Sequence, residues 1–282
     1  MSCKVLIVGL GLIGGSYAAK LKELNYEVGA ITLNQEDIDY ALNNNIIDHG
    51  QIIVSKEYVS QFDLVIFALY PNVFISWIKK YYNYFKKGAI ITDVTGVKKD
   101  IVYTVQEILK DQEVEFIGAH PMAGKEVYGV KNSSKDLFVN ANYLITPTNK
   151  NTKEVIEKSK KLAYDLGFKN VSILSVEEHD EMIAFLSQLT HCIAVSLMTC
   201  KESTHLKEYT GDSFRDLTRI AKINEDMWAE LFMLNKKELL SQMELFENKF
   251  KELKTSLENN DVEAMKEMMR LSTFNRSFFD KN

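Results

Sequence analysis

The sequence predicts an N-terminal α/β domain built on a doubly wound, mostly parallel sheet, followed by an all-α C-terminal domain. All three prolines precede residue 148, and of the 13 glycines only Gly167 and Gly211 follow it. Short apolar runs alternate with amphipathic segments in the first half, whereas the second half shows long helical periodicity with few breaks. The predicted domains are 1–175 and 176–282. A chain of 282 residues is long enough to form two hydrophobic cores.

The composition is that of an ordinary globular protein, with 46% hydrophobic and 26% charged residues. A net charge of −5 argues against a nucleic-acid partner, which needs a basic face. Cys3, Cys192 and Cys200 are odd in number and lack metal-ligand spacing, which suits a reducing compartment. No stretch is expected to span a membrane. We therefore expect a cytoplasmic protein without nucleic-acid or membrane partners.

The N-terminal segment has the order strand, glycine loop, helix. Lys4–Val8 is a β-branched apolar run, GLGLIGGS follows at 9–16, and Tyr17–Leu24 continues with helical periodicity. Glycines in a GxGxxG loop allow a tight turn and let backbone N–H groups approach a pyrophosphate at the helix N-terminus. This predicts a Rossmann-type dinucleotide site, with a glycine turn used only for packing as the alternative.

The second strand is predicted at Glu27–Thr32, and its last residue bears on the choice of cofactor. An acidic residue there would hydrogen-bond the adenosine ribose of NAD, but the position holds Thr32. No lysine or arginine lies between positions 31 and 40 to meet a 2′-phosphate, and Glu36 and Asp37 would repel one. NAD is therefore favoured, and NADP stays open.

The remaining elements follow from apolar periodicity. Further strands are predicted at Ile52–Val54, Asp63–Ala68, Ala89–Asp93, Val114–Ala119, Tyr143–Thr146 and Val171–Leu174. Helices are predicted at Val73–Phe85, Lys98–Leu109, Thr152–Leu166, Glu177–Lys201, Asp212–Ile223, Glu225–Leu257 and Val262–Phe279. Long apolar stripes on C-terminal helices often form a dimer interface, so a homodimer through the helical domain is expected.

His120 follows the predicted strand Val114–Ala119 and precedes a loop with Pro121 and Gly124. This places an imidazole at the carboxyl end of a strand, where open α/β sheets bind their ligands. The alternative is a turn histidine that hydrogen-bonds only its own loop.

Two groups of polar residues in the second half could bind a ligand. Ser187 and His191 are four apart and share a helix face, which suits a ligand wall or a core histidine. Arg215 and Arg219 are also four apart, and like charges at that spacing favour a bound anion. The alternative is a solvated face paired with neighbouring aspartates. The sequence contains no metal-binding motif.

Several segments resemble the prephenate/arogenate dehydrogenase family of tyrosine biosynthesis, and most closely a monofunctional prephenate dehydrogenase. The matching segments are 9–16 (GLGLIGGS), 92–94 with 97–98, 120–124 (HPMAG) with 126 and 129, 179–180, 187 with 191, 214–216 with 218–221, 227–228 and 235. The resemblance implies oxidative decarboxylation of prephenate to 4-hydroxyphenylpyruvate with reduction of NAD.

The resemblance also implies site residues. His120 matches the catalytic histidine that accepts a proton from the ring hydroxyl, and Arg219 matches the arginine that binds a substrate carboxylate. The other implied substrate-binding residues are Arg215, His191, Ser187, Glu126 and Thr95, and the implied cofactor-binding residues are Gly9, Gly11, Leu12, Ile13, Gly14, Thr32 and Asp93.

Two departures from the family pattern concern the neighbourhood of His120. Many members have Gly-Ser where this chain has Thr95-Gly96, so the serine that would steady the histidine is replaced by glycine. The family's His-Leu-Pro-His run becomes Gln188-Leu189-Thr190-His191. Alternatives that stay open are arogenate dehydrogenase, another two-domain NAD(P)-dependent hydroxy-acid dehydrogenase, and a non-catalytic NAD-binding regulator.

Overall fold

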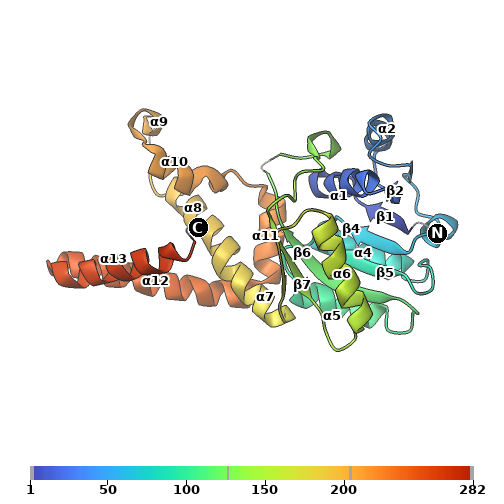
Figure 1. The fold of residues 1–282 in the computed structure, drawn as a ribbon. Helices are drawn as coiled ribbons and strands as arrows, with labels where there is room; N and C mark the ends of the chain where they lie inside the picture. The colour runs from blue at the N-terminus through green and yellow to red at the C-terminus, as the bar shows by residue number, and fades with distance from the viewer. Residues whose placement is uncertain (1–2, 126, 203–204, 280–282) are drawn as a thin grey trace. The chain divides into compact units, whose positions relative to one another are not determined.

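The computed structural model describes residues 3–125, 127–202 and 205–279. The chain forms two compact units, Met1–Asn235 and Lys236–Asn282, and the first contains the sheet together with the helices packed on it (Figure 1). The predicted division near Ser175 falls inside the first unit, at the residue that caps the helix after the last strand.

One eight-stranded sheet has the order β3-β2-β1-β4-β5-β6-β7-β8. All neighbours are parallel except β6 and β7. The strands are β1 Lys4–Val8, β2 Glu27–Ile31, β3 His49–Gln51, β4 Leu64–Phe67, β5 Ile90–Asp93, β6 Glu115–Met122, β7 Asn142–Thr146 and β8 Asn170–Ile173. The order of the first six strands confirms the predicted Rossmann-type, mostly parallel sheet.

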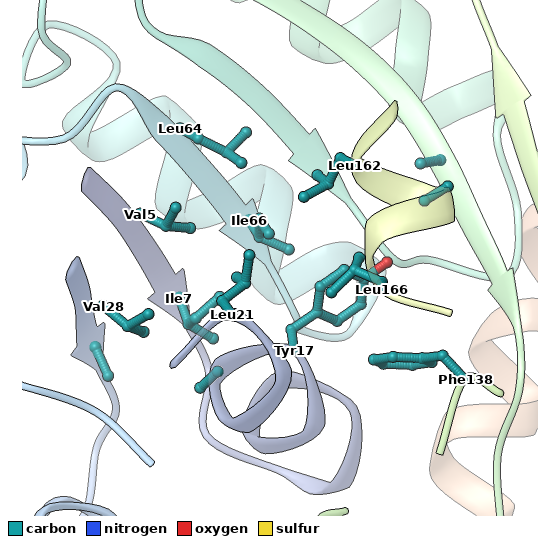
Figure 2. Close-up of a cluster of buried hydrophobic side chains, with 14 of the residues drawn as sticks. Val5, Ile7, Tyr17, Leu21, Val28, Leu64, Ile66, Phe138, Leu162 and Leu166 are labelled. Carbon is teal, nitrogen blue, oxygen red and sulfur yellow. The ribbon is translucent and has the colours of Figure 1, made fainter. Parts of the chain in front are cut away.

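Helices cover both faces of the sheet, because alternate residues of the buried strands point to opposite sides. Val5 and Ile7 of β1 belong to one apolar cluster, which also contains Tyr17 of α1 and Leu162 of α6 (Figure 2). The intervening residues of β1 belong to a second cluster formed with α4 and α5. These helices span α1 Leu12–Glu23, α2 Gln35–Asn43, α3 Lys56–Val59, α4 Pro71–Tyr81, α5 Lys99–Ile108 and α6 Lys153–Asp165, with a 3-10 turn η1 at Val130–Asn132.

Two strand predictions were wrong in position. β3 lies at His49–Gln51 rather than Ile52–Val54, because Asp48 accepts a hydrogen bond from the β2 backbone and His49 bonds Tyr58, which together fix the pairing register. The apolar run that follows is left exposed, with Ile53 at 72%.

β6 continues past its predicted end at Ala119 to Met122, so His120 lies within the strand rather than after it. It pairs with β5 through Ile117 and with antiparallel β7 from Gly118 onward. Antiparallel pairing therefore carries the strand beyond the end of β5. His120 lies where β6 has left β5 and faces the loop that follows β5.

The predicted helix Glu177–Lys201 is a continuous run, α7 Val176–Ile183, the π-helical η2 Ala184–Leu189 and α8 Thr190–Thr199. By length and composition, the 24 residues of Val176–Thr199 are long and apolar enough to cross a membrane. The expectation that the chain contains no such stretch was therefore wrong. A core helix of a globular protein passes the same test. The run also buries polar side chains of His179, Asp180 and Gln188.

The remaining helices are α9 Leu206–Tyr209, α10 Asp212–Thr218, the 3-10 turn η3 Arg219–Ala221, α11 Glu225–Leu234, α12 Lys236–Glu258 and α13 Val262–Ser277. The predicted helix Glu225–Leu257 is interrupted at Asn235, whose side chain donates to the Asp180 carbonyl and to Gln188 Oε1. In the second unit, α12 packs on α13 and many of their apolar side chains are exposed, among them Leu245, Phe250, Leu257, Met269 and Phe274.

Candidate active site

The loop between β1 and α1 requires glycine at two positions. Gly9 has φ +101°, and a Cβ there would lie 2.4 Å from the Ala68 carbonyl oxygen. A Cβ at Gly14 would lie 1.9 Å from the Gly9 carbonyl oxygen. These contacts are with backbone and cannot be relieved by a side-chain rotation, so the sequence fixes this tight turn.

The same loop presents a helix N-terminus to open space. Gly11 is the N-cap of α1, it has no side-chain cap, and a Cβ built on it meets nothing within 4 Å. The first turn of α1 contains no acidic residue that would repel an anion. Unpaired N–H groups and the helix dipole make such an end a binding site for phosphate. Gly11, Leu12 and Ile13 therefore fit the pyrophosphate of a dinucleotide.

A buried ion pair organises the loop that follows β5. The side chains of Asp93 and Lys98 are both fully buried, and Lys98 Nζ lies 2.6 Å from Asp93 Oδ2. Asp93 Oδ1 accepts a 3.2 Å hydrogen bond from the backbone N–H of Ala119, next to His120. Burial lowers the pKa of Lys98, and the Asp93 carboxylate opposes that shift. Asp93 thus holds the strand of His120 against the β5 loop.

Thr95 and Gly96 differ in what they face. The Thr95 hydroxyl bonds Asp93, accepts a 3.0 Å hydrogen bond from Lys98 Nζ, and lies 2.9 Å from the Val97 carbonyl oxygen. A Cβ at Gly96, by contrast, would lie 3.9 Å from His120 Cε1. The threonine hydroxyl is directed into the buried ion pair, while position 96 borders the imidazole of His120.

His120 belongs to a chain of hydrogen-bonded groups. Its Nδ1 lies 3.0 Å from His179 Nε2, and His179 Nδ1 lies 2.7 Å from Asp180 Oδ1. The Asp180 carboxylate accepts hydrogen bonds from the backbone N–H groups of Lys98 and Lys99, at 2.8 and 2.9 Å. The chain therefore runs from the imidazole of His120 to the N-terminus of α5.

The surroundings keep both histidines uncharged. Burial, the neighbouring His179 and the Lys98 ammonium lower the pKa of His120 well below its ordinary value of about 6.5. Burial also lowers the pKa of His179, although its hydrogen bond to Asp180 opposes the shift. His120 is consequently a neutral imidazole at pH 7, the form that can accept a proton.

Helix α11 connects the neighbourhood of His120 with the second group of predicted residues. Leu231 is the nearest side chain to position 96. One turn earlier, Trp228 stacks on His191, with ring centroids 3.7 Å apart. His191 Nδ1 lies 2.8 Å from the carbonyl oxygen of Ser187, a residue of the π-helical turn η2. Such turns occur frequently at functional sites.

The arginines lie on the same side of the first unit as His191. Arg219 is in η3, which packs against α8, and Arg215 is in the preceding helix α10. The exposed guanidinium of Arg215 forms an ion pair with Asp212, the partner expected under the solvated-face alternative. Thr32 follows β2 and donates its backbone N–H to Gln51. Glu126 lies outside the described residues.

The sequence indicated His120 but not the residues that hold its side chain and its strand in place. His179, Asp180 and Lys98 lie in segments that match the family pattern, but no role was assigned to any of them from the sequence. A histidine followed by an acid one turn into an apolar helix is a signal that could have indicated them. The complete burial of Lys98 depends on tertiary packing and has no local sequence signal.

Two family models match the chain over most of its length. Residues 17–172 match the model described as "Prephenate dehydrogenase, nucleotide-binding domain", and residues 175–271 match "Prephenate dehydrogenase, dimerization domain". The prephenate dehydrogenase of Lactococcus lactis is 30% identical over 269 residues, which cover 93% of this chain and 73% of that protein.

Solved structures with the same fold include two from this group of enzymes. The prephenate dehydrogenase of Aquifex aeolicus, in complex with hydroxyphenyl propionate and NAD+, is 31% identical, with a TM-score of 0.89 and 99% of each chain covered. The arogenate dehydrogenase of Synechocystis is 22% identical, with a TM-score of 0.85, covering 98% of this chain and 100% of that one. At that identity, the second likeness concerns the fold alone.

Proposed function

The chain belongs to the prephenate dehydrogenase family, as the resemblance predicted, and we propose a role for each residue of its site in the family's reaction. The protein is an NAD-dependent oxidoreductase that converts prephenate into 4-hydroxyphenylpyruvate and carbon dioxide, a step of tyrosine biosynthesis. This membership favours an enzyme over a non-catalytic regulator, and this reaction over that of another hydroxy-acid dehydrogenase.

His120 is the proposed base. NAD, when bound, accepts the hydride that leaves C4 of the substrate ring. His120 Nε2 takes the proton of the 4-hydroxyl as that carbon becomes a carbonyl. The bond from ring C1 to the departing carboxylate then breaks, its electron pair makes the ring aromatic, and the C4 oxygen recovers the proton from His120. The proton moves from the 4-hydroxyl to His120 and back to the C4 oxygen, so no net proton is released with the carbon dioxide.

The observation that carries this proposal is the placement of His120, which is hydrogen-bonded through Nδ1 and lies beside the β5 loop. Its lowered pKa keeps the imidazole uncharged. A general base must be uncharged before the reaction, and it works best when its pKa lies near the operating pH. Nδ1 is engaged by His179, which leaves Nε2 as the ring nitrogen for the substrate proton.

Arg219 is the proposed partner of a substrate carboxylate, with Arg215 nearby, and His191 and Ser187 form the wall between them and His120. Support comes from η3 packing on α8 and from His191 stacking on a helix that also borders Gly96. A guanidinium offers the planar, bidentate geometry that a carboxylate prefers. Contacts of substrate with Glu126 and Thr95 remain predictions.

Residues of the first βα turn are proposed to bind the cofactor. The pyrophosphate fits the N-terminus of α1 at Gly11, Leu12 and Ile13, with Gly9 and Gly14 required by the turn. Thr32 is proposed to reach the adenosine ribose. Asp93 is proposed to act indirectly, because its carboxylate is occupied by Lys98, Thr95 and Ala119. The resulting preference is for NAD over NADP.

We also propose prephenate rather than arogenate as the substrate, a homodimer formed through the helical domain, and a cytoplasmic location. Two relatives that are 30% and 28% identical over most of this chain are prephenate dehydrogenases. The C-terminal family model is described as a dimerization domain, and α12 and α13 expose apolar side chains. The proposed domain boundary is near Ser175.

The test is the rate of NADH formation, followed by absorbance, with prephenate and separately with arogenate. Turnover on prephenate at a higher kcat/KM is expected, and faster turnover on arogenate would reverse the substrate assignment. His120→Asn is expected to lower kcat by about 10²–10⁴ while leaving the Kd for NAD unchanged. Full turnover by this variant would remove His120 from the reaction.

A further inference from the structure

We propose that His179 and Asp180 are positioning residues that hold His120 in the tautomer protonated at Nδ1, so that Nε2 presents its lone pair to the substrate. The proposal deepens the role of His120 given above and rests on that role. Neither residue is placed to touch the reacting atoms, since His179 contacts His120 on the Nδ1 side of the ring.

The tautomer of His120 follows from the chemistry of the Asp180 carboxylate, which ends the hydrogen-bond chain. An ionised carboxylate can only accept hydrogen bonds, and Asp180 Oδ1 lies 2.7 Å from His179 Nδ1, so this nitrogen carries a proton. A neutral imidazole has one protonated nitrogen, which leaves His179 Nε2 as an acceptor. His120 Nδ1, 3.0 Å away, must then be the donor. Its remaining nitrogen, Nε2, is unprotonated.

The orientation of the Asp180 carboxylate is itself fixed. Both oxygens of Asp180 accept backbone N–H groups, from Lys98 and Lys99 at the start of α5. These two bonds satisfy N–H groups at the N-terminus of α5 and hold the carboxylate in place. Rotation of Asp180 would break both bonds, so the direction of the hydrogen-bond chain is set by the backbone of α5.

The other charged groups around His120 and His179 are consistent with a hydrogen bond donated by His120 to His179. Lys98 and Asp93 face the pair from the β5 loop and form an ion pair with each other, so their charges largely offset. The lowered pKa of His179 keeps it neutral and thereby keeps Nε2 an acceptor. When His120 takes the substrate proton, the positive charge is stabilised through His179 by the Asp180 carboxylate.

The experiment measures the tautomer and the turnover separately. Nitrogen-15 chemical shifts of the histidine rings distinguish a protonated Nδ1 from a protonated Nε2, and the five histidines are few enough to assign with single substitutions. In the unmodified protein without ligands, His120 is expected to show a protonated Nδ1. A protonated Nε2 would overturn the proposal without any variant, and it would leave the reaction assignment untouched.

Two substitutions at His179 then separate positioning from structure. His179→Leu removes the acceptor and is expected to shift His120 toward the Nε2-protonated tautomer and to lower kcat about tenfold or more, with the KM for NAD unchanged. His179→Gln can place its amide oxygen near the original Nε2, so it should restore the tautomer and most of kcat. The glutamine variant keeps the test valid if the leucine variant does not fold.

His49→Gln is the matched control, because His49 also pairs with a hydroxyl and a carboxylate but lies on β3 at the sheet edge. It should change neither the His120 shifts nor kcat. An unchanged tautomer and a kcat within twofold of the parent in His179→Leu would refute the positioning role. Absence of turnover on prephenate by the unmodified protein would instead refute the proposed function.

Discussion

Replacement of Lys98 by methionine tests whether the buried ion pair holds the site together. Methionine keeps most of the length of the lysine stem, so the change removes the charge without opening a large cavity. Lys98 Nζ contributes the bonds to Asp93 Oδ2 and Thr95 Oγ1, and both charged side chains are fully buried. Removing one member of such a pair leaves an uncompensated buried charge and typically costs about 3–5 kcal/mol.

The structure places the expected cost at the lower end of that range. The Asp93 carboxylate still accepts hydrogen bonds from the backbone of Thr95 and Ala119 after the lysine is lost. We therefore expect Lys98→Met to lower the free energy of unfolding by about 3 kcal/mol, measured by urea denaturation at pH 7.

A double-mutant cycle separates the pair from other effects of the substitution. In Asp93→Asn/Lys98→Met both charges are absent, so the double variant should be more stable than the sum of the single changes implies. A coupling free energy of about 2–3 kcal/mol is expected between the two positions. Additive single costs, or a cost below about 1 kcal/mol for Lys98→Met, would refute the reasoning that the pair is energetically isolated from water.

Three further predictions concern the glycines and the histidines. Gly96→Ser should raise kcat/KM for prephenate about threefold to tenfold, because position 96 borders His120 and the new hydroxyl could bond the 4-hydroxyl of bound substrate. Gly96→Ala should not raise it, and equal values for the two variants would contradict this. Gly14→Ala should prevent or severely weaken folding, because the added Cβ would meet the Gly9 carbonyl. Gly11→Ala should fold normally and bind NAD more weakly, and a normal affinity for NAD would remove Gly11 from the cofactor site. The pKa of half-buried His120 and that of buried His179 are lowered, so below about pH 6.5 the unfolded chain binds more protons than the folded chain. Stability therefore falls as the pH is lowered, by up to about 1.4 kcal/mol per pH unit for each histidine. His120→Asn should reduce this slope by about one proton, measured by urea denaturation between pH 5 and 7, and equal slopes would show that His120 is not held neutral.

The sheet and the cofactor loop were accessible from the sequence because their signals are local. A β-branched run, a GxGxxG loop and a helical segment occur in order, and the contacts at Gly9 and Gly14 explain why those residues stand there. The position of β3 and the end of β6 were not accessible. β3 depends on a hydrogen bond between Asp48 and β2, and β6 is extended by pairing with β7, which follows some twenty residues later.

The break at Asn235 also illustrates the limit of periodicity. The apolar pattern continues through this position, so the sequence predicts one helix from Glu225 to Leu257. The interruption coincides with the hydrogen bonds of the Asn235 amide to the Asp180 carbonyl and to Gln188, both distant in the chain. A residue that ends a helix through tertiary contacts leaves no mark on the local pattern.

The β5 loop explains how a chain with Thr95-Gly96 can keep the same catalytic histidine. His120 is held from one side by Asp93, which binds the backbone of Ala119, and from the other by His179, which Asp180 connects to the start of α5. Both supports originate within residues 93–99, and neither uses a side chain at position 96. The Thr95 hydroxyl strengthens the first support by bonding within the ion pair. Orientation of His120 is therefore independent of a hydroxyl at position 96, and such a hydroxyl would act on the substrate alone. This separation is why Gly96→Ser and His179→Leu are expected to change different quantities, kcat/KM through substrate contact in the first and the tautomer of His120 in the second.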